Sequence, residues 1–232
     1  MHHDASRIHV LSIGGSLVVP KQGIDITFLK ALRRFVVKEV NRGKRFILVI
    51  GGGMTARRYQ HAANAVVKLD DEDVDWLGIH ATRINAHLLR TIFRDIALHK
   101  VIKDPSRKLF WNKQVLIAAG WKPGWSTDYI AVRLAKRFGV KRVINLSNID
   151  CVYDRDPYLH EGAKKITAIA WKDFRKIVGS TWEPGANAPF DPIASKLAEK
   201  EKMEVLVAGK DLANVTKMIN GSAFRGTRIY SS

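Results

Sequence analysis

The sequence is poor in cysteine, in long apolar runs and in acidic residues, and each shortage excludes a class of protein. One cysteine, Cys151, occurs in 232 residues, so no disulfide can form within the chain. No apolar run reaches the roughly 18 residues that indicate a membrane-spanning helix. The first residues, MHHDASRIHV, lack the apolar core of a signal peptide. We therefore expect a cytoplasmic protein that does not enter a membrane.

The shortage of acidic residues leaves the chain strongly basic. Lys and Arg number 39 against 22 Asp and Glu, which gives a formal net charge of +17. Such a charge favours polyanionic ligands, of which nucleic acid is one class. The basic residues are nevertheless spread over segments such as KALRRFVVKEVNRGKR and RKLFWNK, which are typical of solvated faces. We therefore expect small anionic ligands, and nucleic acid is not expected as the main partner.

Two nucleotide-binding patterns are also missing, while an alternation of apolar segments is present. The chain contains neither GxxxxGK[ST] nor a dinucleotide fingerprint. Apolar runs predict strands at 7–13, 45–50, 115–119, 142–146 and 203–208. Helical spacing predicts helices at 25–41, 56–69, 79–98, 127–138, 170–178, 191–202 and 215–219. This alternation predicts an α/β fold in which helices cover both faces of a mostly parallel sheet.

Small and turn-forming residues follow four of the expected strands. These are Gly14-Gly15-Ser16, Gly51-Gly52-Gly53, the segment from Gly120 to Gly124, and Ser147-Asn148. The carboxyl ends of parallel strands share one edge of the sheet, where ligands of such folds bind. One glycine-rich turn is weak evidence, but several on one edge predict a phosphate-lined cleft.

The stretch GGGMTARRY, residues 51–59, has the chemistry of a phosphate site. Glycine lets a backbone N–H approach a phosphate oxygen, and a helix that follows adds its positive end. Arg57 adds a planar guanidinium that matches phosphate geometry. The alternative, a tight turn followed by a helix with two surface arginines, is equally compatible with this stretch alone.

Two later stretches carry polar residues in otherwise apolar surroundings. In residues 75–89, Asp75 precedes the expected helix and would suit a helix cap, and Asn85 would suit a packing amide. In residues 118–135, Ser126 or Thr127 can donate to phosphate or can simply cap a helix. Asp128 at the same place can hold a metal or orient a cationic group.

A fourth stretch, NLSNIDCVYDRDP at 145–157, suits a purine nucleotide pocket. Tyr153 would lie near a base, and Asp156 would reach a ribose hydroxyl. A capped turn followed by an ordinary Asp-Pro loop is the alternative.

In their order along the chain, these motifs resemble the UMP kinases of the amino acid kinase superfamily, and most closely the archaeal type. The motifs are GGS, GGGxxARxY, DxxGIxxTRxNAxLL, PGxxTD and NxDxVYxxDP, followed by DPIASK at 191–196 and GTRI at 226–229. Single motifs are weak, but the ordered set covers nearly the whole chain.

The resemblance implies a three-layer αβα sandwich, the amino acid kinase fold, as one domain over 1–232. An acceptor-nucleotide lobe would cover about 1–138, and an ATP-binding lobe would cover about 139–232. It also implies transfer of a phosphoryl group from Mg²⁺-bound ATP to UMP in pyrimidine nucleotide biosynthesis, without a metal site of the protein's own. A homohexamer built as a trimer of dimers is implied as well.

Site residues follow from the resemblance by position. UMP would be bound by Gly51, Gly52, Arg57, Asp75, Gly78, Thr82, Gly120 and Thr127. ATP would be bound by Gly14, Gly15, Ser16, Ser147, Asn148, Tyr153, Asp156 and Pro157. Asp128 matches the aspartate that organises the reaction centre in these relatives.

The chain departs from the family pattern at a few positions. Ser12 stands where many family members have a lysine, although the archaeal type also lacks it, and Cys151 stands where glycine is common. The stretch 180–192 is richer in Trp and Pro than the usual loop. We predict Lys122 as a replacement cation, because its ammonium could neutralise charge that develops on the transferred group. A kinase for another phosphorylated acceptor, or a nucleotide- or nucleic-acid-binding protein without turnover, remain alternatives.

Overall fold

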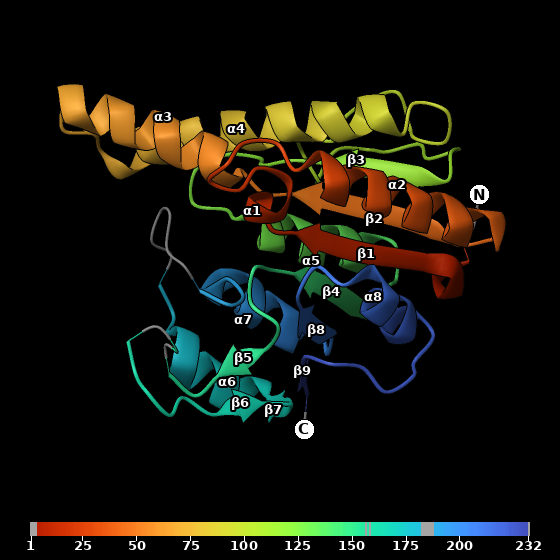
Figure 1. Cartoon of the computed structure of the whole chain (residues 1–232). Helices are drawn as coiled ribbons and strands as arrows, with labels where there is room; N and C mark the ends of the chain where they lie inside the picture. Colours follow the sequence, from red (N-terminus) through yellow and green to blue (C-terminus); the bar gives the residue numbers. More distant parts are fainter. Residues whose placement is uncertain (1–3, 156, 158, 182–187, 232) are drawn as a thin grey trace.

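The computed structural model describes residues 4–155, 157, 159–181 and 188–231 (Figure 1). The strands are β1 (Ile8–Ile13), β2 (Arg45–Ile50), β3 (Val115–Ala118), β4 (Arg142–Leu146), β5 (Val152–Tyr153), β6 (Lys165–Ile166), β7 (Ala168–Ala170), β8 (Glu204–Ala208) and β9 (Thr227–Tyr230). The helices are α1 (Gly15–Val18), α2 (Ile26–Asn41), α3 (Gly53–Val66), α4 (Asp71–Ile92), α5 (Thr127–Arg137), α6 (Trp171–Val178), α7 (Pro192–Lys200) and α8 (Leu212–Ile219), and a 3-10 turn covers Ala5–Arg7.

A seven-stranded sheet runs through the whole molecule in the order β3-β2-β1-β4-β8-β9-β7. The five strands from β3 to β8 are mutually parallel, whereas β9 is antiparallel to β8 and parallel to β7. In this sheet, β3, β2 and β1 come from residues before 139 and form one half, and β4, β8, β9 and β7 come from later residues and form the other half. The carboxyl ends of the five parallel strands share one edge, so the turns that follow them lie in one row.

Alternate residues of the central strands fill two hydrophobic layers. In β2, Phe46, Leu48 and Ile50 pack into the layer that contains α1, α2, α4 and α8. Ile47 and Val49 pack into the opposite layer, with α5, α6 and α7. Because strand side chains point alternately to the two faces, one apolar run serves both layers. The expected αβα sandwich around a mostly parallel sheet is confirmed.

The helix that follows α3 starts more than one turn earlier than the spacing predicts. Asp70 caps α4, since its side chain accepts a hydrogen bond from the Asp73 N–H, and acidic residues fill the first turn. These residues favour a helix start because they face the positive end of the helix dipole. Asp75 therefore lies inside α4, and its predicted role as a cap before the helix was wrong. Similarly, α3 starts at Gly53 rather than at residue 56.

The shortest elements, namely α1, β5, β6, β7 and β9, were not predicted, because two to four residues carry too little periodicity. Among the residues that the structure describes, no helix is both long enough and apolar enough to cross a membrane.

Candidate active site

The glycine turns after β1 and β2 touch each other backbone to backbone. A Cβ added at Gly15 would lie 2.1 Å from the Gly53 nitrogen, and one at Gly51 would lie 2.6 Å from the Gly15 nitrogen. Gly53 also has a φ of +60°, which favours glycine. Three glycines are thus required by the contact between two turns, which brings the two strand ends close together.

The β1 turn also contacts the turn after β4. The Gly14 N–H donates to the Leu146 carbonyl at 2.7 Å, and a Cβ on Gly14 would lie 3.6 Å from the Ser147 Cα. Gly14 and Gly15 therefore lie between the expected acceptor turn at Gly51–Gly53 and the expected donor turn at Ser147. Ser16 follows in α1, where it is half-buried.

Helix α4 holds the turns after β2 and β3 from behind. The buried Asn85 amide donates to the carbonyls of Gly51 at 2.9 Å and Gly52 at 3.0 Å. Thr82 Oγ1 accepts the Gly120 N–H at 2.8 Å and donates to the Ile79 carbonyl. Polar side chains that are buried in this way fix the geometry of the loops they contact.

The loop after β3 makes two further contacts with α4. Arg83 donates to the Trp121 carbonyl at 2.8 Å, and Asp75 Oδ2 accepts the Gly124 N–H at 2.7 Å. Asp75, Thr82 and Asn85 thus lie along one helix that contacts the two turns after β2 and β3. The sequence left the roles of these polar residues open between packing and binding, and the structure gives each a hydrogen-bonded position.

The start of α3 keeps the features of an anion site. Its N-cap is Gly52, which provides no side-chain hydrogen bond, so no side-chain oxygen competes for the positive helix end. Arg57 is exposed one turn later, whereas Arg58 donates to the Lys21 carbonyl at 2.7 Å. Gly78 lies close by, since a Cβ added on Gly52 would be 3.3 Å from the carbonyl oxygen of Gly78.

A cluster of polar side chains lies where the end of β1 meets the start of α5. Ser12 Oγ donates to Asp128 Oδ1 at 2.7 Å, and the Asp191 N–H donates to Asp128 Oδ2 at 3.2 Å. Ser126 caps α5 by accepting the Tyr129 N–H, so Thr127 is the first residue of the helix and is not its cap. Burial raises the pKa of Asp128 above its usual range, although the Ser12 and Asp191 hydrogen bonds oppose the rise.

Asp191 was given no site role from the sequence, although it opens the DPIASK motif. It is 4% exposed and caps α7, and its pKa is raised to about 7 by burial and, secondarily, by the charge of Asp128. The family-like run DPIASK contained the signal, since Asp followed by Pro is typical of a helix start. Its neighbourhood with Asp128 depends on the packing of α7 against α5 and cannot be read from the sequence.

The expected donor residues are less enclosed. Ser147 Oγ donates to Asn148 Oδ1 at 3.2 Å, Asn148 and Pro157 are exposed, and Tyr153 is half-buried in β5. Asp156 lies outside the residues that the structure describes, as do residues 182–187 of the 180–192 stretch. Cys151 is buried and does not adopt a positive φ, so the turn at this position does not require glycine.

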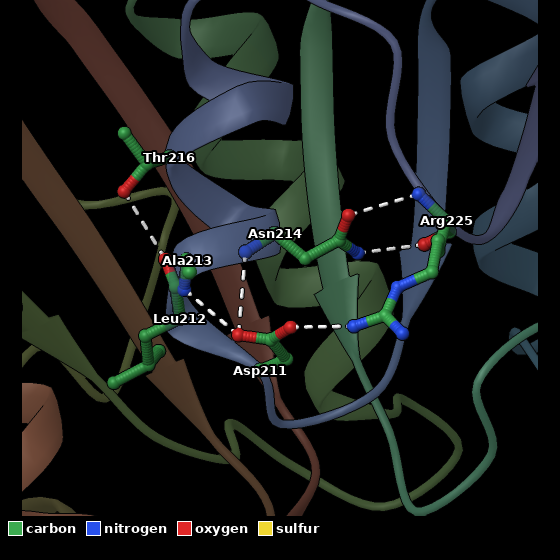
Figure 2. Close-up of polar contacts among 6 residues, drawn as sticks. All are labelled: Asp211, Leu212, Ala213, Asn214, Thr216 and Arg225. Atoms are coloured by element: carbon green, nitrogen blue, oxygen red, sulfur yellow. Dashed lines mark hydrogen bonds and ion pairs between the residues drawn. The ribbon is translucent and has the colours of Figure 1, made fainter.

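Hydrogen bonds in the turn after β8 fix the start of α8. Figure 2 shows Asp211 and Asn214 side by side and both pointing toward Arg225, with Asp211 Oδ2 accepting from the guanidinium at 2.7 Å. The Asn214 amide exchanges two hydrogen bonds with the Arg225 backbone, at 2.7 and 2.8 Å. This cluster ties the helix that follows β8 to the segment that enters β9.

Lys122 is exposed on the loop after β3. Its ammonium lies 4.7 Å from the centre of the Trp121 ring, which is a cation–π distance. Lys122 therefore lies against its neighbour Trp121 on the loop after β3, and its predicted role at the transferred group stays a prediction.

Comparison with known proteins gives consistent matches over nearly the full chain. The model of the amino acid kinase family matches residues 7–209. The uridylate kinase of Methanococcus aeolicus is 32% identical, over 92% of this chain and 95% of that protein. That of Methanocaldococcus jannaschii is also 32% identical, over 94% and 99%. The crystal structure of uridylate kinase from Archaeoglobus fulgidus has a TM-score of 0.79 at 29% identity, and covers 96% of this chain and 99% of that one.

Proposed function

The chain belongs to the amino acid kinase family, and from this premise we propose that it is a uridylate kinase, which transfers the γ-phosphoryl group of ATP to UMP and gives ADP and UDP. One observation carries the proposal beyond similarity. The β1 turn contacts both the turn after β2 and the turn after β4, so two nucleotides bound at these turns would have their phosphates adjacent. Phosphoryl transfer asks for this alignment more than for covalent chemistry by the protein.

We assign the acceptor phosphate to the start of α3. The Gly51 and Gly52 backbone, the positive helix end and the Arg57 guanidinium would hold it. Asp75 and Thr82 of α4, with Gly120 and Gly78, would line the nucleoside pocket, and Thr127 would lie next to the transferred group. The hydrogen bonds of Thr82 and Asp75 to Gly120 and Gly124 support this assignment, because they preform the pocket walls.

We assign the donor nucleotide to the turns after β1 and β4. Gly14, Gly15 and Ser16 would hold the β- and γ-phosphates, while Ser147, Asn148, Tyr153 and Pro157 would contact the nucleoside, together with Asp156. Gly14 supports this assignment because its backbone joins the β4 turn directly.

In the reaction, an oxygen of the UMP phosphate would attack the γ-phosphorus. The new P–O bond forms while the bond to the leaving oxygen of ADP breaks. Asp128, held by Ser12 and by the Asp191 N–H, would orient the groups around the reacting centre. Lys122 would supply positive charge from the loop after β3.

We propose that Mg²⁺ comes with the donor substrate and is not held by a site of the protein's own. In the described part of the chain, no group of three or more His, Cys, Asp or Glu side chains is placed to hold a metal ion. We therefore treat Mg²⁺ as part of the donor substrate, carried on the ATP phosphates.

The test is ADP release from Mg-ATP with UMP, CMP, dUMP, AMP or no acceptor. We expect turnover that depends on UMP, and an Arg57→Ala variant whose KM for UMP rises by about tenfold or more, the loss of a charge-assisted contact. Arg58→Ala is the matched control, because Arg58 is engaged with the Lys21 carbonyl and should change KM little. Turnover with a different phosphorylated acceptor, or none with any, would contradict the assignment.

The proposal also keeps the implied homohexamer and the cytoplasmic location. Sedimentation velocity on the purified chain tests the first, since a hexamer and a dimer differ threefold in mass. The single, buried Cys151 agrees with a reducing compartment.

A further inference from the structure

Asp191 is held in place from several sides. Its Oδ1 accepts the Ala194 N–H at 2.5 Å, and its carbonyl accepts the Ser195 hydroxyl at 2.7 Å. The segment before it is fixed as well, because the Asn145 amide of β4 donates to the Pro189 carbonyl and the Phe190 ring is fully buried. Asp191 therefore has a defined position next to Asp128.

The second carboxyl oxygen of Asp191 is the unusual atom. Oδ2 is buried and has no hydrogen-bond partner within the described part of the chain. The charged group that faces Asp191 is Asp128, from α5. The other facing groups are neutral: the Ser126 hydroxyl from the loop before α5, and the N–H groups of Ile193 and Ala194 on α7, which all lower the pKa of Asp191 and so oppose the rise caused by burial. Ser12 of β1 faces Asp128 from the other side.

Two carboxyl groups thus lie together, and among the residues that the structure describes neither carboxyl forms an ion pair with a cation. A buried carboxylate with one unpartnered oxygen is costly, and like charges at close range favour retention of a proton by one of them. The pKa of Asp191, raised to about 7 by burial and by Asp128, agrees with this reasoning. Asp128 keeps both of its oxygens hydrogen-bonded, so it is the better carrier of the negative charge.

We propose that Asp191 is a positioning residue that works as a neutral carboxylic acid, with its proton on Oδ2. It holds Asp128 through its backbone N–H, while the pair presents one negative charge rather than two to the phosphates of the bound nucleotides. This inference rests on the proposed kinase function for its consequence, but the proton itself can be tested without turnover.

The first test compares kcat/KM of the wild type and of Asp191→Asn between pH 6 and pH 9. Asparagine keeps the oxygen that accepts the Ala194 N–H and stays neutral at every pH. We expect the wild-type value to fall by about tenfold per pH unit above its turning point, as for a single ionisation, mainly through KM of the nucleotides. Asp191→Asn should hold its value within about threefold. Ionisation of UMP is common to both proteins, so their difference reports Asp191. A collapse of Asp191→Asn at all pH values, or identical profiles, would overturn the proposal.

The second test measures thermal unfolding of the same proteins across pH. The folded-state pKa of Asp191 lies above its unfolded value, so its stabilising effect is present at low pH and is lost as the pH rises through about 7. The wild type should therefore unfold several degrees below Asp191→Asn above pH 7, with the gap closing towards pH 4. Asp25→Asn, which makes the same carboxyl-to-amide change at the cap of α2, is the matched control for the substitution itself. A gap that does not change with pH would sink the proposal, whereas absence of turnover alone would count only against the kinase assignment.

Discussion

The proposed acceptor side of the sheet edge, at the turns after β2 and β3, and the proposed donor side, at the turns after β4 and β8, are built differently. On the acceptor side, three side chains of α4, namely Asp75, Thr82 and Asn85, hold the turns after β2 and β3 directly. On the donor side, the Ser147 side chain bonds to its exposed neighbour Asn148, its N–H donates to the Ala208 carbonyl, and the side-chain cross-links lie after β8, at Asn214 and Arg225 (Figure 2).

The difference indicates that the acceptor-side turns are held more rigidly than the donor-side turns. A preformed pocket binds without ordering costs and discriminates well, whereas a pocket with exposed walls adapts to its ligand. We therefore expect discrimination among acceptors to be strict and discrimination among donors to be loose. Each prediction below disturbs one side and uses the other as its reference.

The largest effect is expected from Gly15→Ala. The new Cβ would lie 2.1 Å from the Gly53 nitrogen, and both neighbours are backbone, so the two turns must separate. We expect kcat/KM to fall by two orders of magnitude or more, and the free energy of unfolding to drop by about 3 kcal/mol. Steady-state kinetics and urea unfolding measure the two effects.

Gly209→Ala is the donor-side partner of this change. Its Cβ would lie 2.2 Å from Asp150 Oδ1, which is the end of an exposed side chain that can rotate away. Its cost should stay below about 1 kcal/mol. Equal losses in the two variants would show that the contact between the β1 and β2 turns is no more rigid than the turn after β8.

The next prediction compares the loss of two buried asparagine side chains, Asn85 and Asn214. Asn85→Ala leaves the Gly51 carbonyl without its side-chain donor and the Gly52 carbonyl with only the longer bond from the Ala56 N–H, which should cost about 1–3 kcal/mol and raise KM for UMP. Asn214→Ala should cost a similar amount by freeing the Arg225 backbone, but should leave KM for UMP nearly unchanged. If Asn214→Ala shifts KM for UMP as strongly, the separation of the two sides is wrong.

A smaller effect concerns β1, the strand between the two sides. At the far end of β1, burial lowers the pKa of His9 to about 4, helped by Lys44 and Arg142. The folded-state pKa lies below the unfolded value, so stability is lost as the pH falls from about 6.5 to about 4. We expect the wild type to lose about 1–3 kcal/mol relative to His9→Gln over this range, measured by urea unfolding.

His9→Gln should leave kcat/KM at neutral pH unchanged, because its neighbours Lys44, Glu39 and Arg142 belong to the edge opposite the glycine turns. A loss of activity in this variant would mean that strain at one end of β1 reaches the site.

The elements that carry continuous apolar runs were predictable from the sequence. β2 and β4 match their predicted bounds, because strands buried on both faces leave an unmistakable pattern. The glycine turns were also found, although their main reason is the contact between turns, which depends on β1 and β2 being neighbours.

The partnerships within the site could not be predicted in the same way. Asn85 lies 33 and 34 residues from the carbonyls it holds, and Asp191 lies 63 residues from Asp128. Such contacts are fixed by strand order and helix packing, which a local pattern does not encode. The predicted start of α4 was wrong for a different reason, since an exposed acidic first turn has no apolar periodicity.

The smallest effect within the site is expected at Lys122, on the acceptor-side loop. In the structure its ammonium lies over Trp121 and is exposed, so water already screens much of its charge. We expect Lys122→Met to lower kcat by about three- to tenfold with little change in either KM, because the charge would act on the transferred group alone. Lys122→Arg should retain most of the rate. An unchanged kcat in Lys122→Met would show that Lys122 does not act on the transferred group. The positive charge on the acceptor side would then come from backbone N–H groups, the end of the helix dipole and Arg57.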